Sequence, residues 1–173
     1  MTTTPDNGPA IELVGLTKRF GRATAAVTAV DDLSVRIEPG STFGLIGPNG
    51  AGKTTTIKML MGVLTPTAGI ARVMGADVAG KTLLVKQRVG YVPEIHNIDR
   101  WMRIEEVVGF CGSLYESWND RTCREMLELF GLDAKKKVKH LSKGMLVKLS
   151  LVLAVSHEPE VLVLDEPMAG LDP

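Results

Sequence analysis

The chain has 173 residues, 45% of them hydrophobic and 23% charged, and its 20 basic and 20 acidic side chains give a formal net charge of zero. This length fits one α/β domain with room for a small insertion, and the balanced charge argues against nucleic acid as a partner held by bulk charge. No apolar run approaches the roughly 18 residues of a transmembrane helix. Residues 1–10 lack the pattern of a signal peptide and are expected to form a disordered tail.

Two strands of an antiparallel flank are predicted first, at 11–16 and about 25–37, separated by a turn near 18–22. Glu38-Pro39-Gly40 is a typical turn sequence. It leads into 42–46, a short apolar run that predicts a buried strand.

The segment 47–54 reads Gly-Pro-Asn-Gly-Ala-Gly-Lys-Thr and fits the phosphate-binding pattern G-x-x-x-x-G-K-[ST] at every fixed position. Its glycines let backbone N–H groups surround an anion, and the helix expected to begin near Lys53 adds its positive end. The predicted contacts with nucleotide are Gly47, Pro48, Asn49, Gly50, Ala51, Gly52, Lys53, Thr54 and Thr55. A glycine-rich turn is the alternative, but it would need neither Lys53 nor Thr54.

The helix after this loop is expected to end at 65–69, and 70–73 returns as a strand. A short helix near 81–88 then leads to a strand at Val89–Val92, which Pro93 stops.

Two amphipathic helices follow within about 104–139 and predict a helical subdomain of about 98–145, inserted between strands. Asn119 or Asp120 is the expected N-cap of the second helix, and Gly131 its stop.

Two features of this region have competing interpretations. Cys111 and Cys123 lie on apolar helix stripes, which favours buried reduced thiols over a disulfide or metal site. The basic residues 135–137 with Lys139 are expected to form a solvated face, with a docking surface as the alternative.

A third helix, apolar on nearly all sides and therefore deeply packed, is predicted to begin near Ser142. The continuously apolar strand Val161–Leu164 follows, typical of a central parallel strand covered on both faces. Asp165 at its tip is placed to hold Mg²⁺ beside Thr54, and Glu166 to polarise an attacking water. A solvated turn at the strand end is the alternative.

Four motifs in this order, 47–54, 141–145, 161–167 and 170–173, resemble those of nucleotide-binding domains of ATP-binding cassette (ABC) transporters. The resemblance covers about 11–173. It implies a P-loop NTPase core sheet with an antiparallel β flank and an inserted α-helical subdomain. The resemblance is strongest to the separate ATPase subunit of bacterial exporter-type systems. The segments that indicate this branch are 115–119 and 141–145.

The resemblance also implies roles for single residues. Phe20 matches the aromatic that stacks on adenine, although a strand-end ring packed into the core is the alternative. Glu94 stands where the family has a glutamine that senses Mg²⁺ and the attacking water. A carboxylate can ligate Mg²⁺ but cannot donate an amide hydrogen bond, so the metal role survives better than the water role. Together with Glu166 and Lys53, Glu94 is an expected catalytic residue. Ser142 and Gly144 match the signature motif, which contacts the γ-phosphate held by the other subunit of a dimer. Asp172 matches an acidic residue of the dimer interface.

The function implied is ATP hydrolysis, with ATP and Mg²⁺ as cofactors, coupled to export. The expected partners are an integral membrane permease and a second ATPase subunit, in a homodimer or heterodimer, with no nucleic acid. The expected location is cytoplasmic, on the inner face of the membrane.

Three departures from the family pattern limit this prediction. Lys143 and Met145 replace the usual glycine and glutamine of the signature. The chain also stops at Pro173, before a histidine that contacts the γ-phosphate, so a truncated chain with weak folding stability and poor turnover is expected. The alternatives are a soluble, non-transport cassette ATPase and a nucleotide-binding fragment with little hydrolysis.

Overall fold

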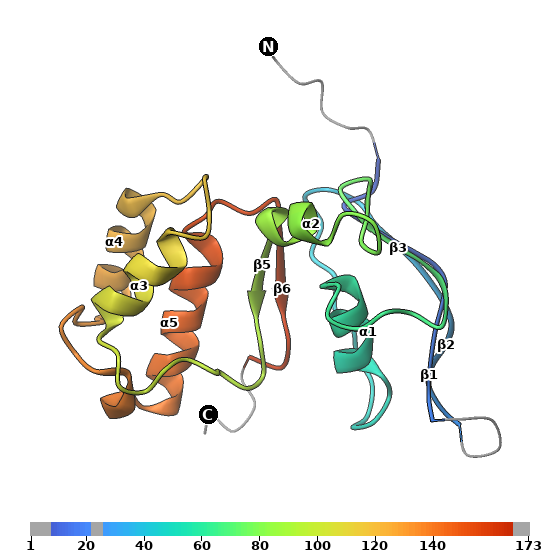
Figure 1. The fold of residues 1–173 in the computed structure, drawn as a ribbon, viewed down its shortest axis with the longest axis horizontal. Helices are drawn as coiled ribbons and strands as arrows, with labels where there is room; N and C mark the ends of the chain where they lie inside the picture. Colours follow the sequence, from blue (N-terminus) through green and yellow to red (C-terminus); the bar gives the residue numbers. More distant parts are fainter. Residues whose placement is uncertain (1–7, 22–25, 168–173) are drawn as a thin grey trace, which may run out of the picture. The chain divides into compact units, whose positions relative to one another are not determined.

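The computed structural model of the chain describes residues 8–21 and 26–167, a mixed α/β structure. The chain divides into two compact units, Met1–Lys86 and Gln87–Pro173, each with its own packing (Figure 1). The predicted tail at 1–10 lies largely outside the described residues, as does Asp172. The turn expected near 18–22 is wrong in its first part, because β1 runs through to Phe20.

The first unit is built on an antiparallel sheet. Its strands are β1 (Ile11–Phe20), β2 (Val27–Ile37), β3 (Ala68–Val73) and β4 (Ala76–Asp77), in the order β2-β1-β3-β4. Across β1 and β3, an ion pair joins Arg72 Nη1 to Glu12 Oε2 at 2.8 Å. The predicted antiparallel flank is confirmed, and β1 continues beyond its expected end.

Helix α1 (Lys53–Leu60) begins at the predicted residue and buries Met59 and Leu60. The expected buried strand at 42–46 is wrong, because the structure assigns no strand there and leaves Ile46 94% exposed. A strand requires a hydrogen-bonded neighbour. In the described part of the first unit, the sheet ends at β2 and β4, and neither pairs with 42–46.

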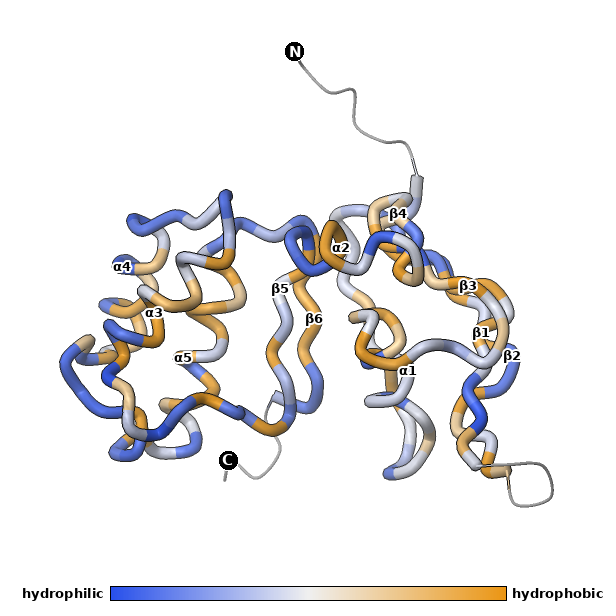
Figure 2. Tube along the Cα trace, in the orientation of Figure 1, coloured by the Kyte–Doolittle hydropathy of each residue, from blue (hydrophilic) through white to orange (hydrophobic). Residues whose placement is uncertain are grey.

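In the second unit, β5 (Val89–Val92) and β6 (Val161–Leu164) pair in parallel, in register from Val89–Val161 to Val92–Leu164. β5 comes directly after α2 (Thr82–Arg88), and the two strands lie side by side in Figure 1. The apolar run of β6, orange in Figure 2, is not covered on both faces as predicted: Leu162 is 45% and Leu164 42% exposed. In the described residues this sheet has two strands only, and no third strand is present there to carry elements that would cover the second face of β6.

The helical segments described after β5 are α3 (Ile104–Gly112), α4 (Asp120–Leu129), the 3₁₀ turn η2 (Val138–His140) and α5 (Lys143–Val155). They share one apolar core whose buried members are Ile104, Val107, Cys123, Leu127, Leu132, Val138, Leu141, Leu149 and Val152. Both cysteines are free, as expected, and burial raises the pKa of each thiol. None of the described helices is long and apolar enough to cross a membrane.

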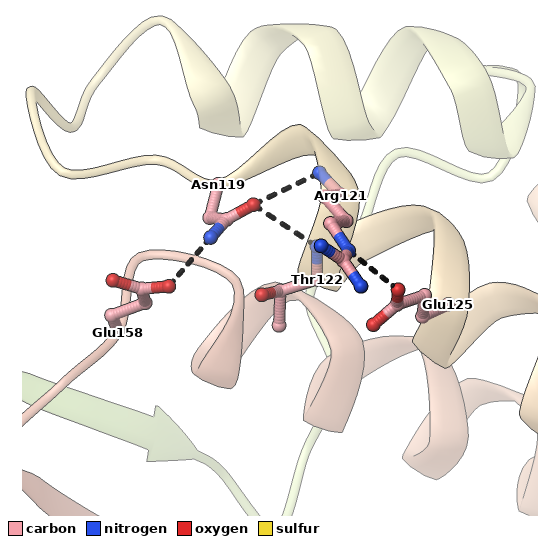
Figure 3. Close-up of polar contacts among 5 residues, drawn as sticks. All are labelled: Asn119, Arg121, Thr122, Glu125 and Glu158. Carbon is pink, nitrogen blue, oxygen red and sulfur yellow. Dashed lines mark hydrogen bonds and ion pairs between the residues drawn. The ribbon is translucent and has the colours of Figure 1, made fainter.

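Asn119 joins the start of α4 to the loop after α5, as Figure 3 shows. Its Oδ1 accepts hydrogen bonds from the backbone N–H groups of Arg121 and Thr122, at 3.0 and 3.1 Å, so Asn119 is the N-cap, one of the two candidates that the sequence predicted. Its Nδ2 donates to Glu158 Oε1 at 2.6 Å. One side chain therefore caps a helix and holds the segment that enters β6.

Candidate functional site

The loop 47–54 connects an exposed segment to the N-terminus of α1 in the first unit. Its backbone turns on Gly50 and Gly52, with φ of 82° and 87°, values that glycine adopts without steric cost. Gly52 is the N-cap of α1 and offers no side chain to accept from the helix, and no acidic residue lies in the first turn. The helix dipole therefore presents a positive end that an anion can neutralise.

Gly52 also sets how closely this loop approaches the sheet. A Cβ at Gly52 would lie 2.3 Å from the carbonyl oxygen of Ala29 in β2, a distance no side chain accepts. Glycine is thus required here for two separate reasons, its left-handed backbone and this close approach.

Lys53 folds back over the loop. Its Nζ donates to the carbonyl oxygens of Gly47, at 2.8 Å, and Pro48, at 3.2 Å. The ammonium group thus lies on the loop that the sequence assigns to phosphate, with Thr54 and Thr55 next to it in the first turn of α1. A positive group held there adds Coulombic attraction to that of the helix end.

Phe20 ends β1, and its residue surface is 43% exposed. The ring therefore does not pack into the core, which was the alternative interpretation. The Lys18 ammonium lies 5.2 Å from the ring centroid and also donates to the carbonyl oxygen of Thr65 at 2.7 Å. The ring remains available for stacking on a flat ligand.

Asp165 follows β6 in the second unit and is only 2% exposed. Its backbone N–H donates to the Val92 carbonyl at 2.9 Å, which extends the pairing of β5 and β6 by one step. The Tyr91 hydroxyl donates to Asp165 Oδ2 in a long hydrogen bond of 3.4 Å. Burial, and then the Asp165 charge, raise the pKa of Tyr91 to about 12, so the hydroxyl keeps its proton near neutral pH.

Glu166 and Glu94 are both exposed at the same end of this parallel pair, just beyond β6 and β5. Glu166 has a φ of 46°, a left-handed conformation that costs a non-glycine residue about 1–2 kcal/mol. Asp32, Met74 and Glu158 have the same kind of backbone, so this strain does not by itself mark Glu166 as functional.

Ser142 is the N-cap of α5, and its Oγ accepts from the Met145 N–H at 3.3 Å. Gly144 lies in the first turn of the same helix, so both predicted signature residues are at its positive end. Further along α5, the buried Ser150 Oγ lies 2.8 Å from His96 Nδ1. Desolvation, followed by the charge of Lys143, lowers the pKa of His96.

The predicted site residues therefore fall into two groups. Phe20 and the loop residues belong to the first unit, whereas Glu94, Ser142, Gly144, Asp165 and Glu166 belong to the second. The sequence did not indicate the contacts of Tyr91 with Asp165 or of His96 with Ser150. The contact of Tyr91 with Asp165 could have been predicted only if the register of β5 against β6 were known. The sequence alone does not determine that register.

A family model described as "ABC transporter" matches residues 30–169, which is more than half of the chain. The chain therefore belongs to the ABC transporter family.

Relatives with known names agree with this assignment. A Nod factor export ATP-binding protein I of Paraburkholderia xenovorans is 40% identical over 170 residues, which are 95% of this chain and 54% of the relative. A protein of the same name from Burkholderia pseudomallei is 43% identical over 150 residues, 83% of this chain and 49% of the relative. The chain thus spans about half the length of these curated relatives.

Solved structures show the same fold. An ATP-binding subunit of an ABC transporter superposes with a TM-score of 0.81 at 29% identity, covering 95% of this chain and 69% of that one. An ATP-binding cassette solved as a dimer with ADP and Pi superposes with a TM-score of 0.82 at 20% identity, covering 94% and 76%. The latter likeness concerns the fold alone.

Proposed function

We propose that this chain is the ATP-binding and ATP-hydrolysing part of an ABC transporter that powers export through a separate membrane-spanning partner. The observation that carries the proposal is the loop 47–54, where Gly52 provides no side chain to cap α1 and Lys53 lies over the loop. Charge, backbone geometry and sequence pattern all favour the phosphates of a nucleotide here.

Within this proposal, the loop residues 47–52 surround the phosphates with backbone N–H groups, and Lys53 reaches the β- and γ-phosphates. Thr54 and Thr55 contribute from the first turn of α1. The exposed ring of Phe20 stacks on the adenine. Each of these residues binds or orients ATP, so the catalysis they provide is charge placement and not covalent chemistry.

The proposed metal is Mg²⁺, which would supply charge neutralisation at the phosphates. Oxygen ligands suit this ion, and it is usually bound by one or two carboxylates together with phosphate oxygens. Asp165 fits this requirement, because its carboxylate is buried at a strand end and is held by a hydroxyl donor. We assign Thr54, Asp165 and Glu94 as the residues that hold the ion, from their positions in the motifs.

Glu166 is the proposed general base for the attacking water, because it is exposed just beyond β6, directly after Asp165. In a homodimer or heterodimer, Ser142 and Gly144 of one subunit would contact the γ-phosphate bound by the other. Their position at the N-terminus of α5 suits an anion. Dimeric cassettes among the similar structures support this arrangement.

The proposed export and location rest on likeness to the relatives. Several named relatives are export ATP-binding proteins, which supports an integral membrane permease as partner and a cytoplasmic position on the inner face of the membrane. At the level of the fold, we propose a P-loop NTPase core sheet with the antiparallel flank and a helical subdomain at about 98–145.

Titration with Mg·ATP tests this function. The wild-type chain should bind ATP saturably, and Lys53→Ala should weaken binding by about tenfold or more, since one charge-assisted contact is lost. Lys58→Ala is the matched control, because Lys58 is exposed on the same helix. Glu166→Gln should retain binding and abolish hydrolysis. Absence of saturable binding by the wild type would contradict the proposal, as would equal effects of the two lysine variants.

A further inference from the structure

We propose that Tyr91 is a positioning residue that orients the Asp165 carboxylate for the divalent cation. This inference rests on the proposed function, in which Asp165 holds Mg²⁺. It assigns a role to a side chain outside the motifs of the sequence, on strand β5.

The backbone around Asp165 is fixed by β5. Four residue pairs join β5 and β6, and Tyr91 is paired with Val163. The next hydrogen bond, from the Asp165 N–H to the Val92 carbonyl, carries this pairing one residue past the end of β6. The main chain at Asp165 is therefore held by the same strand that carries Tyr91.

The side chain of Asp165 still has to be oriented, because the backbone does not fix rotation of a carboxylate. The Tyr91 hydroxyl supplies a donor 3.4 Å from Oδ2. Tyr91 is half-buried and Asp165 is 2% exposed, so neither side chain has much freedom to move away. Hydrogen bonds at catalytic sites are often long in proteins without their ligands and tighten once the ligand is bound.

Donors that hold a metal-binding carboxylate contribute to metal affinity, and their removal typically costs about tenfold or more. Tyr91 fills this role for Asp165. If Tyr91 only packed against β6, phenylalanine at this position would support the same metal affinity, since the two rings have nearly the same volume. The hydroxyl is thus the group to remove.

The experiment measures binding of Mn²⁺, as a paramagnetic substitute for Mg²⁺, to the ATP complex of the full chain by electron paramagnetic resonance. Tyr91→Phe should weaken Mn²⁺ binding by about tenfold. Affinity for ATP in the presence of EDTA should stay within about twofold of the wild type, because the phosphate loop is unchanged. Tyr115→Phe is the matched control: it removes the hydroxyl of the other tyrosine, whose ring stacks on His157 with centroids 4.1 Å apart.

Each result decides the question. Tyr91→Phe with wild-type Mn²⁺ affinity overturns the inference, and so does an equal loss in Tyr115→Phe. A Tyr91→Phe variant that loses metal-free ATP binding to the same extent shows a structural role and also overturns it. If the wild type itself binds no ATP, the proposed function fails; if the wild type binds and only the Tyr91 effect is absent, this inference alone fails.

Discussion

Gly50 and Gly52 have nearly the same left-handed backbone, with φ of 82° and 87°, but different surroundings. Apart from Gly50 and its two chain neighbours, no heavy atom of the described structure lies within 4 Å of a Cβ built on Gly50, whereas a Cβ on Gly52 meets the Ala29 carbonyl at 2.3 Å. Comparing Gly50 with Gly52 therefore separates two reasons for a glycine that usually occur together. One is the left-handed backbone and the other is close packing.

Gly52→Ala should destabilise the protein more than Gly50→Ala does. Both variants carry the strain of a left-handed alanine, about 1–2 kcal/mol. Gly52→Ala must in addition push the start of α1 away from β2, which should raise the loss to about 3 kcal/mol or more and weaken ATP binding. Urea unfolding and ATP titration of both variants measure this difference.

Gly50→Ala is the control for strain alone. Equal losses of stability in the two variants would mean that α1 yields to the extra methyl group, and the close approach to Ala29 would then carry no energetic weight.

Residues with a fixed spacing were predictable from the sequence, and residues brought together by strand pairing were not. The loop 47–54 contains its own chemistry, because its glycines, Lys53 and Thr54 are consecutive. Tyr91 and Asp165 are 74 residues apart, and their contact depends on the register of β5 against β6. Periodicity predicts that each strand exists, but it does not give which residues face one another.

At the scale of elements, Asn119 has the most clearly defined task, as the cap of α4 and the donor to Glu158 (Figure 3). Asn119→Ala should lower the free energy of unfolding by about 1–2 kcal/mol, since a lost N-cap costs about 1 kcal/mol and a hydrogen bond to an exposed charged group adds less. The melting temperature should fall by about 3–6 °C. Thermal unfolding followed by circular dichroism measures the change.

Asn119→Asp is the matched variant. It retains an oxygen that caps α4 and favours the helix N-terminus, but it replaces the donor to Glu158 with a like charge. Its loss should be smaller than that of Asn119→Ala. If the two variants were equally destabilised, the contact with Glu158 and not the cap would be the larger contribution.

Helices were predicted better than the strands of the parallel sheet. The stripes of α3 and α4 are periodic along the chain, so each helix carries the signal for its own buried face. The segment 42–46 and β6 have the apolar composition of buried strands, but burial of a strand depends on neighbours elsewhere in the chain. The first forms no strand in the described structure and the second is covered incompletely, whereas the local antiparallel pairing of β1 with β2 was predicted.

At the scale of the whole chain, the family match over 30–169 extends across both compact units. The order of the four motifs is enough to predict this family, because motif order is a property of the entire chain and does not depend on how strands pair. The predicted bounds of the helical subdomain, 98–145, stay a prediction.

The stability of the whole chain should depend on pH through His157. This residue is 1% exposed, its ring stacks on Tyr115, and within the described structure neither ring nitrogen has a hydrogen-bond partner of good geometry. Desolvation lowers the pKa of His157, although the nearby carbonyls of Leu153 and Val89 oppose this shift. The folded state therefore favours the neutral ring.

A histidine of the unfolded chain has a pKa of about 6.5. The stabilisation is therefore complete above about pH 6.5 and is lost as the pH falls toward the lower pKa of the folded state, because the unfolded chain then binds a proton that the folded chain excludes. The loss should reach at most about 1.4 kcal/mol per pH unit from this one group. Urea unfolding between pH 5 and 8 should show a smaller slope in His157→Phe, which keeps a ring against Tyr115. The pKa of His96 is also lowered, so we expect His96 to contribute to the pH dependence of stability that remains in His157→Phe. A His157→Phe variant with the full wild-type slope would show that His157 binds protons equally in the folded and unfolded states and contributes nothing to the slope.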